Sequence, residues 1–279
     1  MNEKLKITSL LKLLDDPDDE IYTVVELKLL EYGYDALNEL NHCENENELF
    51  KQRAEKIKSK IIHTETLKLF REFISSKEDP DLEEGVFILS KTVNPFLQTS
   101  IYKNVLNEYA KDLKSHISTD ILTTDILEKI SNYLFVKRNF TPNVENYQLL
   151  SNHLIDKVLE TKMGIPLSLS FIYMFVAQRL NIPLKGIGLP GHFIVALDVY
   201  DETIYVDPFS YGKLITKKDC KNLVERSGFN FYDDILVPVS TKQMLERMIR
   251  NMISSYEKME NFIESQILLQ YIDILHWKY

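Results

Sequence analysis

Apolar residues recur at the spacing of an α-helix through most of the first 146 residues. The first two predicted helices carry apolar residues on one face, at Leu10, Leu11, Leu14, Ile21, Val25, Leu27, Leu29 and Leu30. Two "DPD" stretches predict helix starts, with Asp16 and Asp79 as N-caps and a proline in the first turn. Gly33 is expected to end the second helix. A longer helix is expected from about residue 46 to 74.

Periodicity changes in the middle of the chain. The stretch "IPLSLSFIYMFVAQRLN", residues 165–181, is apolar almost throughout and predicts a central helix buried on most sides. Alternating runs then predict strands over about 184–188, 193–199 and 203–206. Helical spacing returns in the last 40 residues, where Ser240 is the expected cap of a helix pair. Because helices and strands are segregated along the chain, the fold class is predicted to be α+β.

Composition narrows the functional classes. The 279 residues include 33 Lys and Arg against 42 Asp and Glu, a net charge of −9, which argues against a nucleic-acid binder. The N-terminus has no apolar run typical of a signal peptide, and no later run approaches the roughly 18 residues of a membrane span. Two distant cysteines, Cys43 and Cys220, are typical of a reducing compartment. These features predict a cytoplasmic protein that contacts neither membrane nor nucleic acid.

The stretch "LPGHFIVALDVYDETIYVDPF", residues 189–209, predicts a β-hairpin with a histidine near its start and an aspartate near its end. His192 and Asp207 would form two-thirds of a nucleophilic triad. The polar turn falls slightly late for their 15-residue separation. An offset or a bulge is therefore expected to bring the two side chains together.

Four motifs in order resemble the SirB-one family of the transglutaminase-like superfamily: "NYLF", "GIPLSLS", "PGHF" and "VDPF". The resemblance runs from about residue 79 to the C-terminus. It predicts an N-terminal helical region over 1–78 and a transglutaminase-like domain over 79–237, with a helical lead-in over 79–146. The remaining residues, 238–279, are predicted to form a helix pair that resembles a tetratricopeptide unit.

The resemblance implies a papain-like core in which a Cys opens the central helix, a His begins a strand and an Asp lies on the next strand. His192 and Asp207 match the last two positions. The position after the Gly-x pair that should hold the Cys is Pro166, which has no nucleophilic atom. Neither Cys43 nor Cys220 matches the site. The resemblance therefore implies a superfamily member without the catalytic thiol.

Other residues of the implied cleft have two interpretations each. Ser168 and Ser170 are weak candidate nucleophiles, and packing of small residues between helix and sheet is the favoured interpretation. Lys162, where the family usually has Arg, is either a solvated helix end or a cation lining the cleft with Pro166, Ser170 and Gly191. His153 is expected to be a surface or capping residue. No metal-ligand spacing or phosphate-binding loop is present, so no cofactor is expected.

Three functions remain open at this stage. The favoured hypothesis is a non-catalytic module that binds a peptide or protein partner in the former active-site cleft. The alternative is an acyl-transfer enzyme or amide hydrolase that uses His192 and Asp207 with a serine or a water molecule. The third is a helical scaffold whose last helix, near Trp277, packs on its own core or contacts a partner. The sequence does not determine the oligomeric state.

Overall fold

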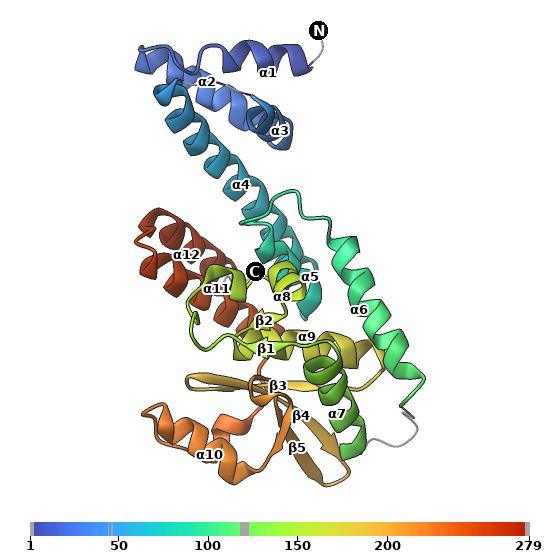
Figure 1. The fold of residues 1–279 in the computed structure, drawn as a ribbon. Helices are drawn as coiled ribbons and strands as arrows, with labels where there is room; N and C mark the ends of the chain where they lie inside the picture. The colour runs from blue at the N-terminus through green and yellow to red at the C-terminus, as the bar shows by residue number, and fades with distance from the viewer. Residues whose placement is uncertain (1–2, 44, 46, 118–122, 277–279) are drawn as a thin grey trace. The chain divides into compact units, whose positions relative to one another are not determined.

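The computed structural model describes residues 3–43, 45, 47–117 and 123–276 (Figure 1). The chain divides into two compact units. The first comprises 1–72 and 91–95, and the second comprises 73–90 and 96–279. The three-part division by sequence motifs stays a prediction.

The first unit is a helical cluster. It contains α1 (Glu3–Leu11), α2 (Asp19–Tyr32), α3 (Tyr34–His42) and most of α4 (Glu48–Ser76). Leu11, Leu14, Val25 and Leu29 are buried in its core, as their helical spacing predicts, whereas Leu27 is 57% exposed. Arg53 ties the α1–α2 connection down by donating to the carbonyls of Leu14 and Asp16. Because burial of an apolar face supplies most of a helix's stability, these helices depend on one another.

In both "DPD" stretches the predicted N-cap lies two residues too early. Helix α2 is capped by Asp18, whose carboxylate accepts from the Glu20 N–H, rather than by Asp16. In the same way, Asp81 accepts from the Glu84 N–H at the start of α5 (Leu82–Ser90), where Asp79 was expected. The proline therefore precedes the cap, because the aspartate after it reaches the free N–H groups of the first turn.

Helices of the second unit surround a buried central helix, α9 (Pro166–Arg179), of which eleven of fourteen residues are buried. This confirms the predicted central helix. Around it lie α6 (Thr99–Lys114), α7 (Thr124–Ser131), the π-helix η1 (Asn132–Lys137), the 3-10 helix η2 (Leu150–Asn152) and α8 (Ile155–Thr161). The 3-10 helix η2 and α8 are separate elements, because Leu154 between them has an extended backbone.

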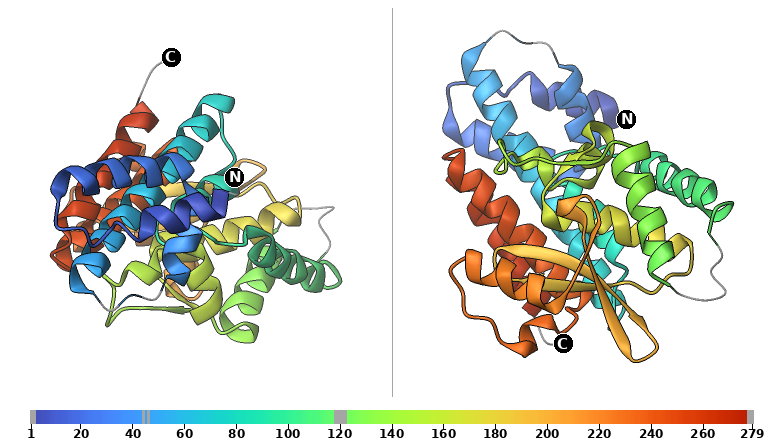
Figure 2. Two further views of the ribbon diagram at one scale, coloured as in Figure 1. Left: turned by 90° about the horizontal axis from the view of Figure 1, so that it is seen from above. Right: turned by 60° about the horizontal axis from the view of Figure 1, so that its bottom comes forward.

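Four antiparallel strands form the main sheet in the order β3-β4-β5-β6. They are β3 (Lys185–Leu189), β4 (His192–Val199), β5 (Glu202–Asp207) and β6 (Lys213–Ile215), and a minor parallel pair joins β1 (Thr141–Pro142) to β2 (Met163–Gly164). One face of the sheet meets α9, where the rings of Phe171 and Phe193 pack edge to face. The other face packs against α10 (Lys217–Arg226) through Cys220 and Val224 (Figure 2). The architecture is α+β, as predicted.

A short 3-10 helix, η3 (Pro208–Ser210), joins β5 to β6, and a second, η4 (Asp233–Leu236), precedes the C-terminal pair, α11 (Thr241–Lys258) and α12 (Phe262–His276). Ser240 caps α11 by accepting from the Gln243 N–H, which confirms the predicted cap. The similarity of this pair to a tetratricopeptide unit stays a prediction, and Trp277 and Tyr279 lie outside the described residues. None of the helices within the described ranges has the length and apolar character needed to cross a membrane.

Candidate functional site

A hydrogen bond joins His192 and Asp207, with Nε2 2.9 Å from Oδ1. Pairing of β4 with β5 is unbroken from Val195 opposite Val206 to the two-residue turn at 200–201. That register places Asp207 opposite Ile194, two residues from His192 on the same side of the pleat. Diagonal neighbours of this kind lie within reach of long side chains. The offset expected between the two residues is therefore the ordinary diagonal of a hairpin, without a bulge.

Asp207 is 1% exposed and accepts several hydrogen bonds at the end of β5. Besides His192, its carboxylate accepts from the Phe209 and Ser210 N–H groups, which begin η3, and from the Ser210 hydroxyl. Burial acts to raise the pKa of Asp207, but its hydrogen bond to His192 and the charge there, with the other donors, lower it overall. Asp207 therefore holds the end of β5 as well as the imidazole.

The start of α9 lies across a small cavity from His192. Pro166 occupies the first turn, where its missing N–H costs nothing. The Ser168 hydroxyl caps this turn by accepting from the Ile165 N–H at 3.0 Å, and it also donates to the Ile165 carbonyl. A Cβ at Gly164 would lie 2.7 Å from that hydroxyl oxygen, so the motif "GIPLS" needs its glycine for close approach.

A cavity of ≈ 210 Å³ lies between the two walls. The described residues that line it are Tyr147, Ile165, Pro166, Leu167, Gly191, His192, Phe193, Arg247 and Asn251. The structure thus brings together three of the residues named from sequence, Pro166, Gly191 and His192. The lining residues include no serine, threonine or cysteine.

Neither serine of α9 lines this cavity. Ser168 is 2% exposed and engaged in the helix cap, and Ser170 is fully buried with its hydroxyl 3.5 Å from the Phe193 carbonyl. Cys220 is buried in the core between the sheet and α10, and burial raises the pKa of its thiol to about 11. A thiol in such an environment is inert. Cys43 belongs to the first unit.

Lys162 and His153 have structural partners. Lys162 ends α8 in the left-handed conformation, and its ammonium donates to the Tyr109 hydroxyl and lies 4.8 Å from the centre of the Phe140 ring. His153 is 3% exposed, so the expectation of a surface residue is wrong, but it occupies the C-cap position of η2, in line with the other expectation, a capping residue. Its Nε2 lies 2.7 Å from the Ser255 hydroxyl, and burial lowers the pKa of His153 to about 4. Neither residue lines the cavity beside His192.

Arg247 is the site residue that sequence analysis missed. It projects from α11, and its Nη2 donates to the carbonyls of Leu189 and His192 at 2.8 Å each. Those carbonyls flank the tight turn that carries Gly191, whose φ of +70° suits glycine. Arg247 also lines an adjoining cavity of ≈ 420 Å³ along 188–191 and the outer face of α11. In the sequence, Arg247 has the spacing of an ordinary charged residue on the surface of a helix. Only its contacts in the folded protein identify it as a site residue.

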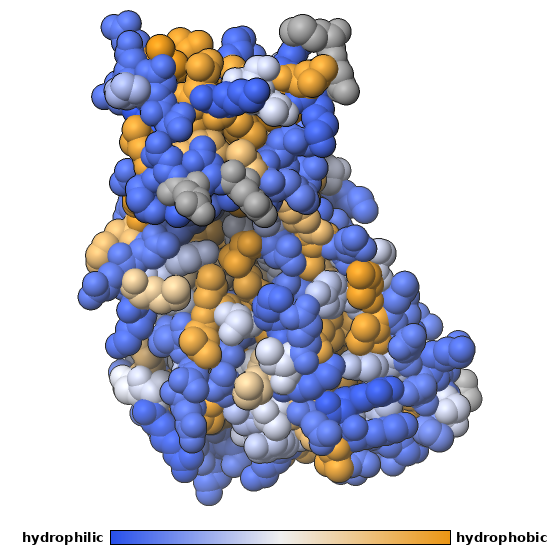
Figure 3. All heavy atoms as spheres, turned by 45° about the horizontal axis from the view of Figure 1, so that its top comes forward, coloured by the Kyte–Doolittle hydropathy of each residue, from blue (hydrophilic) through white to orange (hydrophobic). Residues whose placement is uncertain are grey.

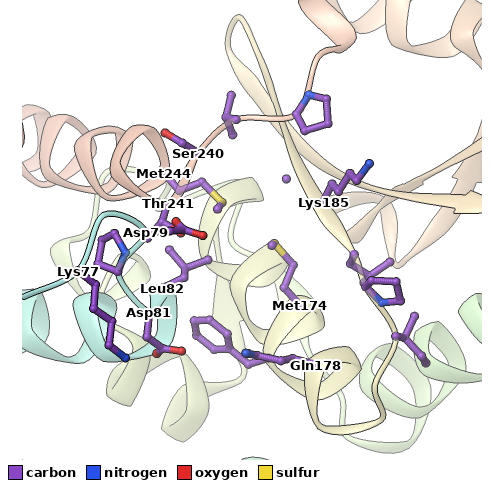
Figure 4. A pocket seen from close by; sticks show the side chains of 18 residues that line it. Lys77, Asp79, Asp81, Leu82, Met174, Gln178, Lys185, Ser240, Thr241 and Met244 are labelled. Atoms are coloured by element: carbon purple, nitrogen blue, oxygen red, sulfur yellow. The ribbon is translucent and has the colours of Figure 1, made fainter. Parts of the chain in front are cut away.

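A larger cavity of ≈ 710 Å³ lies elsewhere in the second unit, between α9, the start of α11 and the residues before α5. Figure 4 shows its apolar side chains directed inward, including Leu82, Met174 and Met244. The charged side chains lie around them and include Lys77, Asp81 and Lys185. It shares no lining residue with the cavity beside His192. Its mixed charges select no ligand class. Over the described ranges, no group of three or more His, Cys, Asp or Glu could hold a metal ion.

A central helix lies across an antiparallel sheet, and His192 lines the same cavity as Pro166 at the start of that helix. The family described as transglutaminase-like superfamily matches residues 101–250, which include Pro166, His192, Asp207 and Arg247. The chain belongs to the transglutaminase-like superfamily.

Relatives of this superfamily member come from bacteria and animals. A UPF0162 protein of Xylella fastidiosa (strain 9a5c) is 31% identical over 181 residues, which are 63% of this chain and 64% of that protein. A UPF0162 protein of Vibrio cholerae is 28% identical over 138 residues, 49% of this chain and 51% of the relative. F-box only protein 21 of Mus musculus is 32% identical over 158 residues, 53% of this chain but 24% of the relative. No solved structure matches the chain.

Proposed function

We propose that this chain is a non-catalytic, SirB-one-type member of the transglutaminase-like superfamily that binds a peptide or protein segment in its former active-site cleft. The observation that carries the proposal is Pro166, which stands where the catalytic Cys is expected and lines the same cavity as His192. A proline side chain can neither attack a carbonyl nor exchange a proton. The cleft is thus shaped like an active site but lacks the group that would form an acyl-enzyme.

Retention of the His–Asp pair does not by itself require catalysis. Asp207 caps η3 and accepts from four donors, so replacing it would leave the buried imidazole and the partly buried Phe209 N–H without this acceptor. His192 fills the corner beside Phe209, with ring centres 5.9 Å apart. Both residues therefore contribute to the fold of the hairpin. Their structural role supports a protein that keeps this His–Asp pair without using it for catalysis.

The cavity walls combine polar and apolar groups. Leu167, Phe193 and the Tyr147 ring contribute carbon surface, and the adjoining cavity extends along the outside of the 188–191 turn. Ligand sites are concave, mostly apolar and provided with a few placed polar groups. A short peptide segment matches this combination of size and lining.

Binding of displayed peptides would test the proposal. The intact protein is immobilised, and a library of random displayed peptides is selected on it, followed by calorimetry with the enriched sequences. Asn251→Trp, which fills the cavity from α11, is expected to abolish binding. The matched control is Glu257→Trp, at an exposed position of the same helix, which is expected to leave binding unchanged. Failure to enrich any peptide, or equal binding by both variants, would contradict the proposal.

The alternative is a working hydrolase that uses His192 and Asp207 to activate a water molecule, and the intact hydrogen bond between them favours it. A serine mechanism has less support because the hydroxyls of Ser168 and Ser170 are buried and engaged with backbone groups. An activated ester such as p-nitrophenyl acetate distinguishes the cases. Turnover that disappears in His192→Ala would establish the alternative, and turnover equal in both proteins would leave the binding proposal standing.

Protein contacts outside the cleft form a further part of the proposal. Apolar side chains reach the surface among polar ones over the N-terminal helices at the top of Figure 3, and Leu5, Val24 and Leu27 are each more than half exposed. F-box only protein 21 matches over only 24% of its length, so a similar domain occurs there as part of a longer protein. We expect the chain to act in the cytoplasm within a protein assembly. Capture of a partner that is lost in Val24→Asp but not in Asn251→Trp would assign these contacts to the helical flank.

A further inference from the structure

One side of the small cavity consists of hydrogen-bond donors. Arg247 and Asn251 project from successive turns of α11, and Tyr147 faces them from the segment before η2. Residues four apart on a helix lie on one face, so the guanidinium and the carboxamide are neighbours. No aspartate or glutamate is among the nine lining residues. The cavity therefore presents positive charge without a negative side chain of its own.

The charge of Arg247 lacks a compensating anion. Nη2 is occupied by two backbone carbonyls, but Nε and Nη1 make no hydrogen bond or ion pair with any described residue. Burial lowers the pKa of Arg247, as expected for a partly desolvated guanidinium. Its neighbour Arg250 differs, because it is exposed and pairs with Glu246. A desolvated charge without a counter-charge is costly in a folded protein, and a bound anion would relieve that cost.

Tyr147 has a free donor directed to the same place. Its hydroxyl makes no hydrogen bond with any residue in the described part of the chain. Burial raises the pKa of Tyr147, and the positive charge of Arg247 acts in the opposite direction, so the two groups are close enough to interact. The phenol is protonated at neutral pH and can donate. Asn251 likewise makes no side-chain hydrogen bond with a described residue, which leaves three unused donors at one wall.

We propose that Arg247, with Tyr147 and Asn251, binds the free C-terminal carboxylate of a peptide whose last side chain enters the cavity between Pro166 and His192. The inference rests on the proposed function, since it names the class of segment that the cleft receives. A guanidinium binds a carboxylate through two parallel N–H groups, which adds orientation to affinity. Capture of a terminal carboxylate by a cluster of donors is a known mode of peptide recognition.

The volumes argue for a chain end rather than a passing loop. The cavity beside His192, at ≈ 210 Å³, is half the size of the adjoining one and suits a single side chain better than a length of backbone. The adjoining ≈ 420 Å³ cavity shares Gly191 and Arg247 with it and can hold the preceding residues. A peptide that lies in the larger cavity and places its last side chain in the smaller one ends beside Arg247.

Two peptide libraries that differ only at the C-terminus test this inference. Mixed-sequence heptapeptides are prepared as free acids and as amides, each is incubated with the intact protein, and bound peptides are identified by mass spectrometry after size exclusion. Calorimetry then compares acid and amide forms of the best binders. We expect the acid forms to bind about tenfold tighter or more, because the amide loses the charged hydrogen bonds.

Variants assign the preference to its residue. Arg247→Gln should remove the difference between acid and amide, and Arg247→Lys should retain part of it. Lys258→Gln, at an exposed cation of the same helix that lines neither cavity, should retain all of it. The comparison of acid and amide in the unaltered protein keeps the test valid if Arg247→Gln fails to fold. Equal binding of both forms would overturn the carboxylate site and leave the proposed function intact. Binding of Asp- or Glu-containing amides through Arg247 would also overturn it, whereas binding from neither library would refute the proposed function itself.

Discussion

The two walls of the small cavity offer different chemistry. The hairpin wall retains His192 and Asp207 in direct hydrogen bond, with the carboxylate buried and fully engaged. The helix wall has the predicted position and buried packing of α9, but Pro166 begins it. The difference follows from what each residue does for the fold. A nucleophile at the first turn of a helix can be replaced by proline at little cost, whereas Asp207 cannot be removed without releasing four donors.

Asp207→Ala should have the largest effect on stability and would break the hairpin wall. We expect the free energy of unfolding to fall by about 3 kcal/mol, because the change leaves the buried imidazole without its carboxylate and removes the cap of η3. Urea unfolding followed by circular dichroism measures the loss. The control is Asp198→Ala, an exposed carboxylate on the same hairpin that pairs with Lys185 and should cost less than about 1 kcal/mol. Equal losses in both variants would contradict the central role of Asp207.

Asp207→Asn sharpens the same point through pH, with a smaller expected loss of about 2 kcal/mol at neutral pH. The lowered pKa of Asp207 means that its contribution is complete above the unfolded pKa of about 3.9 and is lost as pH falls through the folded pKa. The stability difference between the two proteins should therefore be constant from about pH 7 to 5 and shrink below about pH 4. Thermal unfolding at several pH values measures it. A difference that persists unchanged at pH 3 would contradict the assignment.

Gly191→Ala tests the turn that Arg247 holds. A Cβ there would lie 2.7 Å from the Ser227 hydroxyl oxygen at a φ of +70°, so we expect a loss of about 2 kcal/mol. Gly228→Ala is the matched control, because its φ is +83° but nothing lies within 4 Å of the added carbon. It should lose only the conformational part, about 1 kcal/mol. If the control loses as much as Gly191→Ala, the contact with Ser227 carries no energy.

Pro166→Cys would place a thiol at the start of α9 and test whether the two walls face each other. If His192 lowers the thiol pKa by about two units, alkylation by iodoacetamide at pH 6 should be about tenfold faster than in Pro166→Cys/His192→Ala. Mass spectrometry of residue 166 measures the rate, in a Cys43→Ser background that removes the other partly exposed thiol. Identical rates with and without His192 would mean that the imidazole does not reach the start of α9.

Ser168→Ala should have the smallest effect and separates a structural from a catalytic serine. Loss of the helix-cap hydroxyl is expected to cost about 0.5–1 kcal/mol in thermal or urea unfolding. Peptide binding in the cleft should be unchanged, because Ser168 does not line the cavity. Loss of an esterase activity together with unchanged stability would instead favour the serine mechanism.

Local errors in the sequence analysis have a common cause. Asp16 and Asp79 were expected as caps, but in each "DPD" the second aspartate caps the helix. Composition identifies a helix start near such a stretch, whereas the choice between two carboxylates depends on the backbone path into the helix. The same holds for His153, whose burial against Ser255 depends on α11, a hundred residues later in the chain.

Local periodicity and motif order were enough to predict the α+β class, the buried central helix and the hairpin with its His and Asp. That position 166 has no thiol can be read directly from the sequence. Tertiary structure alone decided that the His–Asp contact is a hairpin diagonal and that Ser168 is a cap. It also brought Arg247, 55 residues after His192, against the cleft. In the sequence, a charged residue on an amphipathic helix has the same spacing whether its side chain lies in water or in a cavity. Only packing removes the water and gives that charge a place in the site.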